Sequence, residues 1–113
     1  MIAKVRNVGQ VTILDVPQRL TAGHEAERLQ SDLEALLAKG QKSILINLNQ
    51  VSFLDSSGLG VLLTLKKAAL VANAKLKLLR PQKKVCSLIA ETGLQKVFEC
   101  FDDEKTAVRS FQT

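Results

Sequence analysis

The segment 44–48, Ile-Leu-Ile-Asn-Leu, is apolar at four of its five positions, which leaves few places for it in a folded chain. A strand with one face in water alternates apolar and polar side chains, whereas a strand covered on both faces is apolar almost throughout. We therefore expect residues 44–48 to form the central strand of a sheet that is covered on both faces.

The segments after this strand alternate between helix and strand. Apolar spacing and turn residues predict a helix over about 58–72, a strand over 75–79, a helix from Pro81 to Gly93, a strand over 97–101 and a last helix after Asp103. Asn73 should end the first of these helices in left-handed backbone. Strand, helix, strand, helix, strand implies two crossover connections, so the sheet should be largely parallel.

The residues before the central strand add an antiparallel part and a first helix. Two short strands are expected within residues 2–16, with a turn at Asn7 to Gly9. Thr21 is placed to cap a helix that Gly40 ends, with apolar residues at helical spacing: Ala22, Ala26, Leu29, Leu33, Leu36 and Leu37. The 113 residues should form a single α/β domain, a mixed, mostly parallel sheet with about four helices.

Residues 55–60, Asp-Ser-Ser-Gly-Leu-Gly, collect hydroxyls, a carboxylate and glycines where the helix after the central strand begins. A side-chain oxygen there can accept from free N–H groups of the first turn, so a plain helix cap is one interpretation. Glycine inside a helix costs about 1 kcal/mol relative to alanine, and a plain helix start does not require two. Gly58 and Gly60 therefore indicate close approach of a partner, which we expect also to contact an exposed Leu59.

Common catalytic and metal sites do not fit this turn. A serine hydrolase needs a histidine, and the single one, His24, lies at the start of the first helix, while the turn is not a G-x-S-x-G elbow. A Walker loop needs Lys and Ser or Thr where Val61 and Leu62 stand. A receiver domain needs an acidic pair, and only Asp15 ends the earlier strand. We predict no enzyme, metal or cofactor.

The formal net charge is +5 and the pI is near 9.5. The basic residues close in sequence are Lys75, Lys77, Arg80, Lys83 and Lys84. No aromatic residues interleave them to stack on bases, and the usual nucleic-acid-binding motifs are absent. We expect a solvated basic face that attracts an acidic protein partner rather than nucleic acid.

Two further features concern the cellular location. Cys86 and Cys100 are too few and too far apart for a disulfide framework or a metal pair, so we expect both to be reduced and buried as small hydrophobic residues. The start, MIAKVRNVGQ, lacks the pattern of an export signal, and no stretch is long enough to span a bilayer. We expect a cytoplasmic protein with no membrane partner.

Phosphorylation would change this turn strongly. A phosphate on Ser56 would add about −1.5 to −2 charges beside Asp55, and the helix N-terminus would partly stabilise it. The turn could then stay folded and still repel an acidic or close-packed partner. Such a switch would need no catalytic group on this chain.

The segment ILINLNQVSFLDSSGLGVLLTLKKA, residues 44–68, resembles the STAS domain, specifically that of bacterial anti-sigma-factor antagonists (anti-anti-sigma factors). A looser likeness continues to residue 108. In that family the serine directly after the aspartate is phosphorylated, which places the acceptor at Ser56 and leaves Ser57 as the cap. The partner-binding residues that the resemblance and the turn imply are Asp55, Ser57, Gly58, Leu59, Gly60, Thr21 and Ala22.

The resemblance implies a STAS fold and a switch between partners. In the family, the unphosphorylated antagonist binds an anti-sigma factor, itself a serine kinase of the GHKL ATPase type, and so releases the sigma factor. Phosphorylation, expected here on Ser56, breaks that complex, and a serine phosphatase resets it. The chain would thus control transcription through protein contacts.

Pro17 and Gln18 depart from the family pattern, which has an aliphatic and an acidic residue before the matching Thr21 and Ala22. The target could therefore be an anti-sigma factor or another kinase-like regulator. The alternative is a non-switching STAS module, a scaffold or a domain that binds a small ligand or nucleotide, in which DSSGLG is only a capped turn.

Overall fold

The computed structural model describes residues 4–16, 19–20, 24–51, 53–54 and 56–112. Its strands are β1 (Lys4–Val8), β2 (Val11–Asp15), β3 (Arg19–Leu20), β4 (Ser43–Asn47), β5 (Phe53–Leu54), β6 (Lys75–Leu79) and β7 (Cys100–Phe101). Its helices are α1 (His24–Ala38), α2 (Ser56–Val71), α3 (Lys83–Glu91) and α4 (Glu104–Ser110), with a short 3-10 helix, η1 (Leu94–Lys96).

The main sheet has five strands in the order β1-β2-β4-β6-β7. β1 and β2 form an antiparallel hairpin, and β2, β4, β6 and β7 run parallel to their neighbours. Two crossovers, through α2 and α3, connect the parallel strands after β4, as the order of elements predicted. The mixed, mostly parallel sheet is thereby confirmed.

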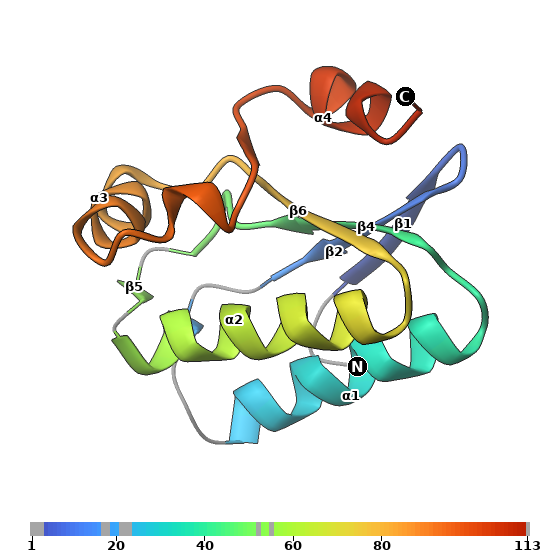
Figure 1. Cartoon of the computed structure of the whole chain (residues 1–113), viewed down its shortest axis with the longest axis horizontal. Coiled ribbons are helices and arrows are strands. Elements are labelled where there is room, and N and C mark those ends of the chain that lie inside the picture. Colours follow the sequence, from blue (N-terminus) through green and yellow to red (C-terminus); the bar gives the residue numbers. More distant parts are fainter. Residues whose placement is uncertain (1–3, 17–18, 21–23, 52, 55, 113) are drawn as a thin grey trace.

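Helices cover both faces of this sheet, with α1 and α2 side by side on one face and α4 on the other (Figure 1). β4 contributes side chains to the hydrophobic cores on both faces. Ile44 and Ile46 belong to the core against α1 and α2, and Leu45 belongs to the core against α4. All three side chains are fully buried. The apolar run 44–48 is therefore a central strand covered on both faces, as predicted.

Several predicted boundaries are confirmed by backbone geometry. Gly40 follows α1 with φ 89°, and Asn73 follows α2 with φ 58°, both in the left-handed region. α3 begins at Lys83, so Pro81 lies before the helix rather than opening it. The proposed cap Thr21 lies outside the described residues.

The strand predicted over 97–101 is shorter in the structure. η1 occupies Leu94–Lys96, Phe98 turns into the core with 3% of its surface exposed, and β7 consists of Cys100–Phe101 alone. The inward turn at Phe98 interrupts the extended chain. β7 is therefore short, and β6 pairs with it only from Leu78 onward.

The expected burial of the two cysteines is wrong. Cys86 on α3 and Cys100 on β7 are both free and exposed. The Cys100 thiol is nevertheless partly covered, and this burial, with the nearby Cys86 and Asp102, raises the pKa of Cys100 to about 11. The thiolate of Cys100 is therefore scarce near neutral pH.

A charged cluster joins the N-terminal hairpin to the last helix. Arg6 Nε donates to Asp15 Oδ2 at 2.6 Å, and Arg6 Nη2 donates to Asp15 Oδ1 at 3.0 Å and to Glu104 Oε1 at 2.9 Å. Asn47 Nδ2 also donates to Asp15 Oδ1 at 2.7 Å. Burial alone would raise the pKa of Asp15, but the hydrogen bonds from Arg6 and Asn47 lower it below its ordinary value.

Replacing Asp15 by Asn should lower the free energy of unfolding at pH 7 by about 1–2 kcal/mol, because charge-assisted hydrogen bonds to Arg6 are weakened. Since the pKa of Asp15 is lowered by folding, its stabilisation is complete above the unfolded pKa and is lost as pH falls through the folded pKa. Urea unfolding from pH 7 to pH 2 measures both effects. The difference between wild type and Asp15→Asn should shrink at low pH, and a constant difference would contradict the assignment.

Candidate functional site

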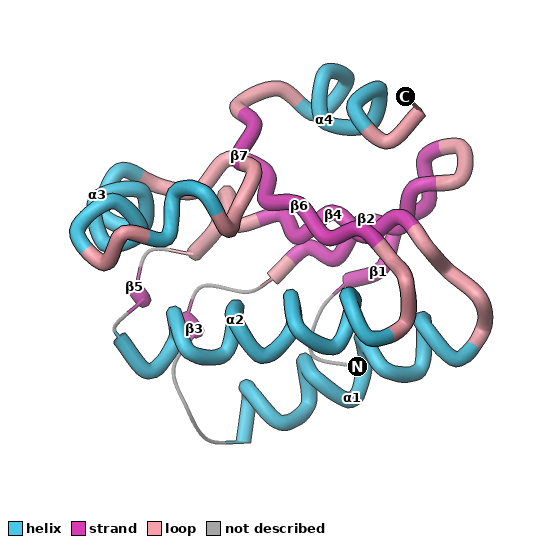
Figure 2. Tube along the Cα trace, viewed as in Figure 1, coloured by secondary structure: helices cyan, strands magenta, loops and turns pink. Residues whose placement is uncertain are grey.

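A second, two-stranded pairing lies apart from the main sheet, at the starts of α1 and α2 (Figure 2). β3 and β5 are parallel, with Arg19 opposite Phe53 and Leu20 opposite Leu54. The chain therefore leaves Leu20 and Leu54 in the same direction, and the helices that follow, α1 and α2, pack against each other. This pairing sets where the DSSGLG turn lies.

Ser56 and Ser57 are exposed in the first turn of α2. Because the helix begins at Ser56, Ser57 is the second helical residue, and the prediction that Ser57 caps α2 is wrong. Both hydroxyls lie at the end of the helix where N–H groups lack intrahelical acceptors.

Leu59 and Gly58 face the core rather than the solvent. Leu59 is 4% exposed and packs in the same cluster as Leu62 and Leu65. The expectation of an exposed Leu59 is therefore wrong, for a reason visible in the helical spacing: Leu59, Leu62 and Leu65 share one buried stripe. The buried Leu59 side chain therefore anchors the first turn of α2 to the hydrophobic core.

Gly60 is exposed, and a Cβ built on it meets no atom within 4 Å. Its carbonyl accepts a hydrogen bond from Thr64 Oγ1 at 3.0 Å, an ordinary contact along a helix. The fold therefore does not require a glycine at position 60. The absence of a side chain leaves the first turn of α2 open to close approach from outside.

A shallow groove lies beside this turn, between β5 and α3. Its volume is about 380 Å³, and its lining consists of Leu54, Lys83, Lys84, Ser87, Leu88 and Glu91. Gln82 at the start of α3 donates from Nε2 to the Asn49 carbonyl at 3.0 Å, which ties α3 to the loop that follows β4. Two lysines against one glutamate make the groove basic, and the first turn of α2 contains no acidic residue.

The single solvated basic face predicted from the sequence does not form. Lys83 and Lys84 line the groove beside Leu54, whereas Lys75 and Lys77 line a different cavity on β6. Lys77 is only 8% exposed, so its predicted solvation is wrong. Side chains alternate between the two faces of the sheet along β6, and Lys77 lies on the face where its Nζ contacts the ring of Phe111.

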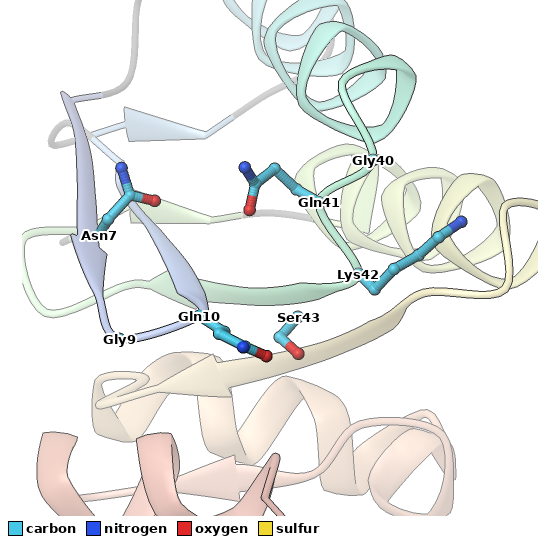
Figure 3. A pocket seen from close by; sticks show the side chains of 7 residues that line it. All are labelled: Asn7, Gly9, Gln10, Gly40, Gln41, Lys42 and Ser43. Carbon is cyan, nitrogen blue, oxygen red and sulfur yellow. The ribbon is translucent and has the colours of Figure 1, made fainter.

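A third cavity, of about 450 Å³, lies where the β1–β2 turn meets the loop before β4 (Figure 3). Asn7 and Gln41 face each other across it, and Lys42 points away. The buried Thr12 hydroxyl lies 3.1 Å from Asn7 Oδ1 and 2.9 Å from Gln41 Oε1, so both amides are tied to the fold. No periodic pattern in the sequence indicated this cavity.

Some predicted site residues lie outside the described residues, namely Asp55, Thr21, Ala22, Pro17 and Gln18. Within the part of the chain that is described, no cluster of three or more His, Cys, Asp or Glu could hold a metal ion. Over the same residues, no helix is both long and apolar enough to cross a bilayer. Asp15, the acidic residue that a receiver-like site would need beside the acceptor candidate Asp55, is engaged by Arg6 and Asn47.

This combination of a mostly parallel mixed sheet, helices on both faces and a serine turn opening α2 is that of a STAS fold. The chain belongs to the STAS domain family, whose sequence profile matches residues 3–107. The architecture and the family that the sequence predicted are thereby confirmed.

The relatives carry regulatory names. BtrV of Bordetella bronchiseptica, a candidate anti-sigma factor antagonist, is 25% identical over 88 residues, which cover 78% of this chain and 76% of BtrV. A candidate anti-sigma factor antagonist from Thermotoga maritima is 23% identical, with a TM-score of 0.88 over 98% of this chain and 95% of that one. The Bacillus anti-sigma factor antagonist SpoIIAA, unphosphorylated, is 20% identical, with a TM-score of 0.80 over 97% of this chain and 96% of its own.

Gly60→Ala should raise the free energy of unfolding by about 0.5–1 kcal/mol, because alanine is the better helix former and the added methyl group meets empty space. Urea unfolding at pH 7 provides the measurement. Thr64→Ala, one turn along the same helix, is the comparison variant: it removes the hydroxyl that donates to the carbonyl of residue 60, a hydrogen bond that Gly60→Ala keeps. A destabilised Gly60→Ala variant would show that the backbone at this position is not that of an ordinary helix.

Proposed function

We propose that the protein is an anti-sigma-factor antagonist whose partner binding is switched by phosphorylation of Ser56. The observation that carries the proposal is the exposure of Ser56 in the first turn of α2, on a helix start fixed from below by buried Leu59. A kinase can reach such a hydroxyl without unfolding the domain. The family membership supports the same assignment.

The electrostatics of the turn favour a modification that leaves the fold intact. The helix N-terminus carries a partial positive charge, and no residue within the first turn of α2 is acidic, although Asp55 directly precedes the helix in the sequence. A phosphate adds about −1.5 to −2 charges and three acceptor oxygens at this place. The phosphorylated turn is therefore expected to stay helical while its surface charge changes sign.

The exposed Gly60 supports a close-packed partner. Glycine at position 60 lowers the stability of the helix, and no neighbouring atom of the domain would clash with a larger side chain there. The reason for the glycine is therefore expected to be a contact with another molecule. A partner's backbone can approach the helix there, and a phosphate on Ser56, four residues earlier, would have to be desolvated in that contact. Desolvating an unpaired phosphate is unfavourable, so the complex should dissociate.

The proposed partners are an anti-sigma factor that is also a GHKL-type serine kinase, and a serine phosphatase that restores the hydroxyl. SpoIIAA of Bacillus has been solved in phosphorylated and unphosphorylated forms, which supports a two-state cycle for a protein of this fold. Lys83 and Lys84 beside Leu54 offer positive charge to an acidic partner surface. The remaining proposed contacts are Asp55, Ser57, Thr21 and Ala22. Gly58 and Leu59, which the sequence also assigned to the contact surface, are buried and support the turn from inside. No catalytic group, nucleic acid or membrane is required, and the switch would act in the cytoplasm.

Ser56→Ala should abolish phosphorylation by the cognate kinase, because it removes the acceptor oxygen. The measurement is incorporation of labelled phosphate from ATP, with the site located by mass spectrometry. Ser57→Ala is the matched control, since Ser57 is the neighbouring exposed hydroxyl in the same turn, and it should keep the label. Label retained in Ser56→Ala and lost in Ser57→Ala would move the acceptor to Ser57.

Ser56→Asp should weaken the protein's affinity for the partner that binds its unphosphorylated form by about two orders of magnitude. The reason is that the substitution places a charge in a desolvated contact. Gly60→Ala should weaken the same complex through its methyl group while the free protein is not destabilised. Surface plasmon resonance with the partner captured from a pull-down measures both. Unchanged binding in both variants would support the alternative of a non-switching module in which DSSGLG only begins a helix.

A further inference from the structure

A cavity of about 550 Å³ lies at the outer edge of β6, away from the serine turn. Its charged and polar lining comes from four elements or their neighbours: Lys66 of α2, Lys75 and Lys77 of β6, Glu99 before β7, and Ser110 of α4. Lys66 follows Ser56 by ten residues along α2, a distance of about 15 Å. The cavity is thus a separate place from the proposed phosphorylation site.

The edge of β6 is incompletely paired at this cavity. β7 is only two residues long and pairs with Leu78 and Leu79, so the first half of β6 has no strand on that side within the described part of the chain. Leu78 N–H points to this side, where it donates to the Glu99 carbonyl at 2.9 Å. Backbone groups alternate along a strand, so Leu76 N–H and C=O face the same edge.

The two backbone groups of Leu76 differ in their partners. Its carbonyl accepts a hydrogen bond from Lys66 Nζ at 3.1 Å. Its N–H has no acceptor among the hydrogen bonds of the described residues. Leu76 is fully buried, however, so this N–H is closed to solvent, and the donors that can reach a ligand in the cavity are those of its lysines.

Lys77 supplies a fixed positive charge. Its Nζ donates to the Ser110 carbonyl at 3.1 Å and to Ser110 Oγ at 2.9 Å, and lies 4.7 Å from the centre of the Phe111 ring. The carboxylate nearest to it is Glu99, at 3.4 Å, and that side chain is 65% exposed. A largely solvated carboxylate compensates a buried ammonium only in part.

We propose that this cavity binds a small multivalent anion with phosphate or carboxylate groups. Lys66 uses one of its three N–H donors on Leu76, and Lys75 is exposed, so both have donors for the anion. These two ammonium groups form the donor set, and Lys77, which is 8% exposed, adds its charge from the buried side. With Glu99 as the one carboxylate against three lysines in the lining, the cavity carries a net charge of +2.

The same geometry disfavours an added β-strand as the occupant. An extended peptide on this edge would need both the N–H and the carbonyl of Leu76, but Lys66 already occupies the carbonyl. The unpaired edge is also short, since β7 begins opposite Leu78. Lysine on a short open edge is a common way to prevent strand addition, whereas a compact anion needs only the donors that remain.

The test is an NMR titration of the ¹⁵N-labelled full chain with pyrophosphate and, separately, with citrate, at constant ionic strength. Saturable shifts are expected at the amides of Leu76, Lys77 and Ser110, with those of Ser56 and Ser57 unchanged. Tighter binding of pyrophosphate would assign a phosphate ligand, and tighter binding of citrate a carboxylate ligand. Either result supports the proposal independently of the partner switch.

Lys75→Gln should weaken the anion's affinity about tenfold, since it removes one charge-assisted contact from an exposed position. Lys83→Gln removes the same charge from α3, outside this cavity, and should leave the affinity unchanged. The proposal is overturned if neither anion saturates the shifts by ~10 mM. It is also overturned if both variants lose affinity equally, or if the shifted amides lie at the serine turn.

Discussion

The burial of β4 on both faces is the constraint on which the other elements depend. Ile44, Leu45 and Ile46 are all inaccessible to water, and their side chains reach two separate cores. A strand of this kind is stable only if both helical layers are present and both its edges are paired, here by β2 and β6. The placement of α1, α2 and α4 follows from that requirement.

The sequence predicted the main sheet because its signals are local and periodic. Continuous apolarity marked β4, alternation marked β2, and glycine or asparagine marked the helix ends at Gly40 and Asn73. The pairing of β3 with β5 was not predicted, since each strand has two residues and their contact joins Leu20 to Leu54 across a whole helix and strand. A two-residue strand contains too few positions to display a period.

At the candidate site, residue types were easier to predict than their orientation. The motif drew attention to Ser56 and Gly60, which are exposed as a contact surface requires. It also assigned Leu59 to that surface, although the stripe with Leu62 and Leu65 places it inside. The prediction that Lys77 and Lys83 share one basic face was wrong for a similar reason. Closeness in sequence does not determine which side of a sheet or which end of a strand a residue occupies.

Arg6 links the two ends of the described chain. Its guanidinium binds Asp15 within the hairpin and Glu104 on the last helix, a partner 98 residues away. The first contact closes a short loop, whereas the second spans the three crossovers between β2 and β7 and closes a long loop, which costs more entropy. The Arg6–Glu104 pair therefore couples the N-terminal hairpin to α4, and it makes the hairpin sensitive to whatever is attached to, or removed from, the C-terminal helix.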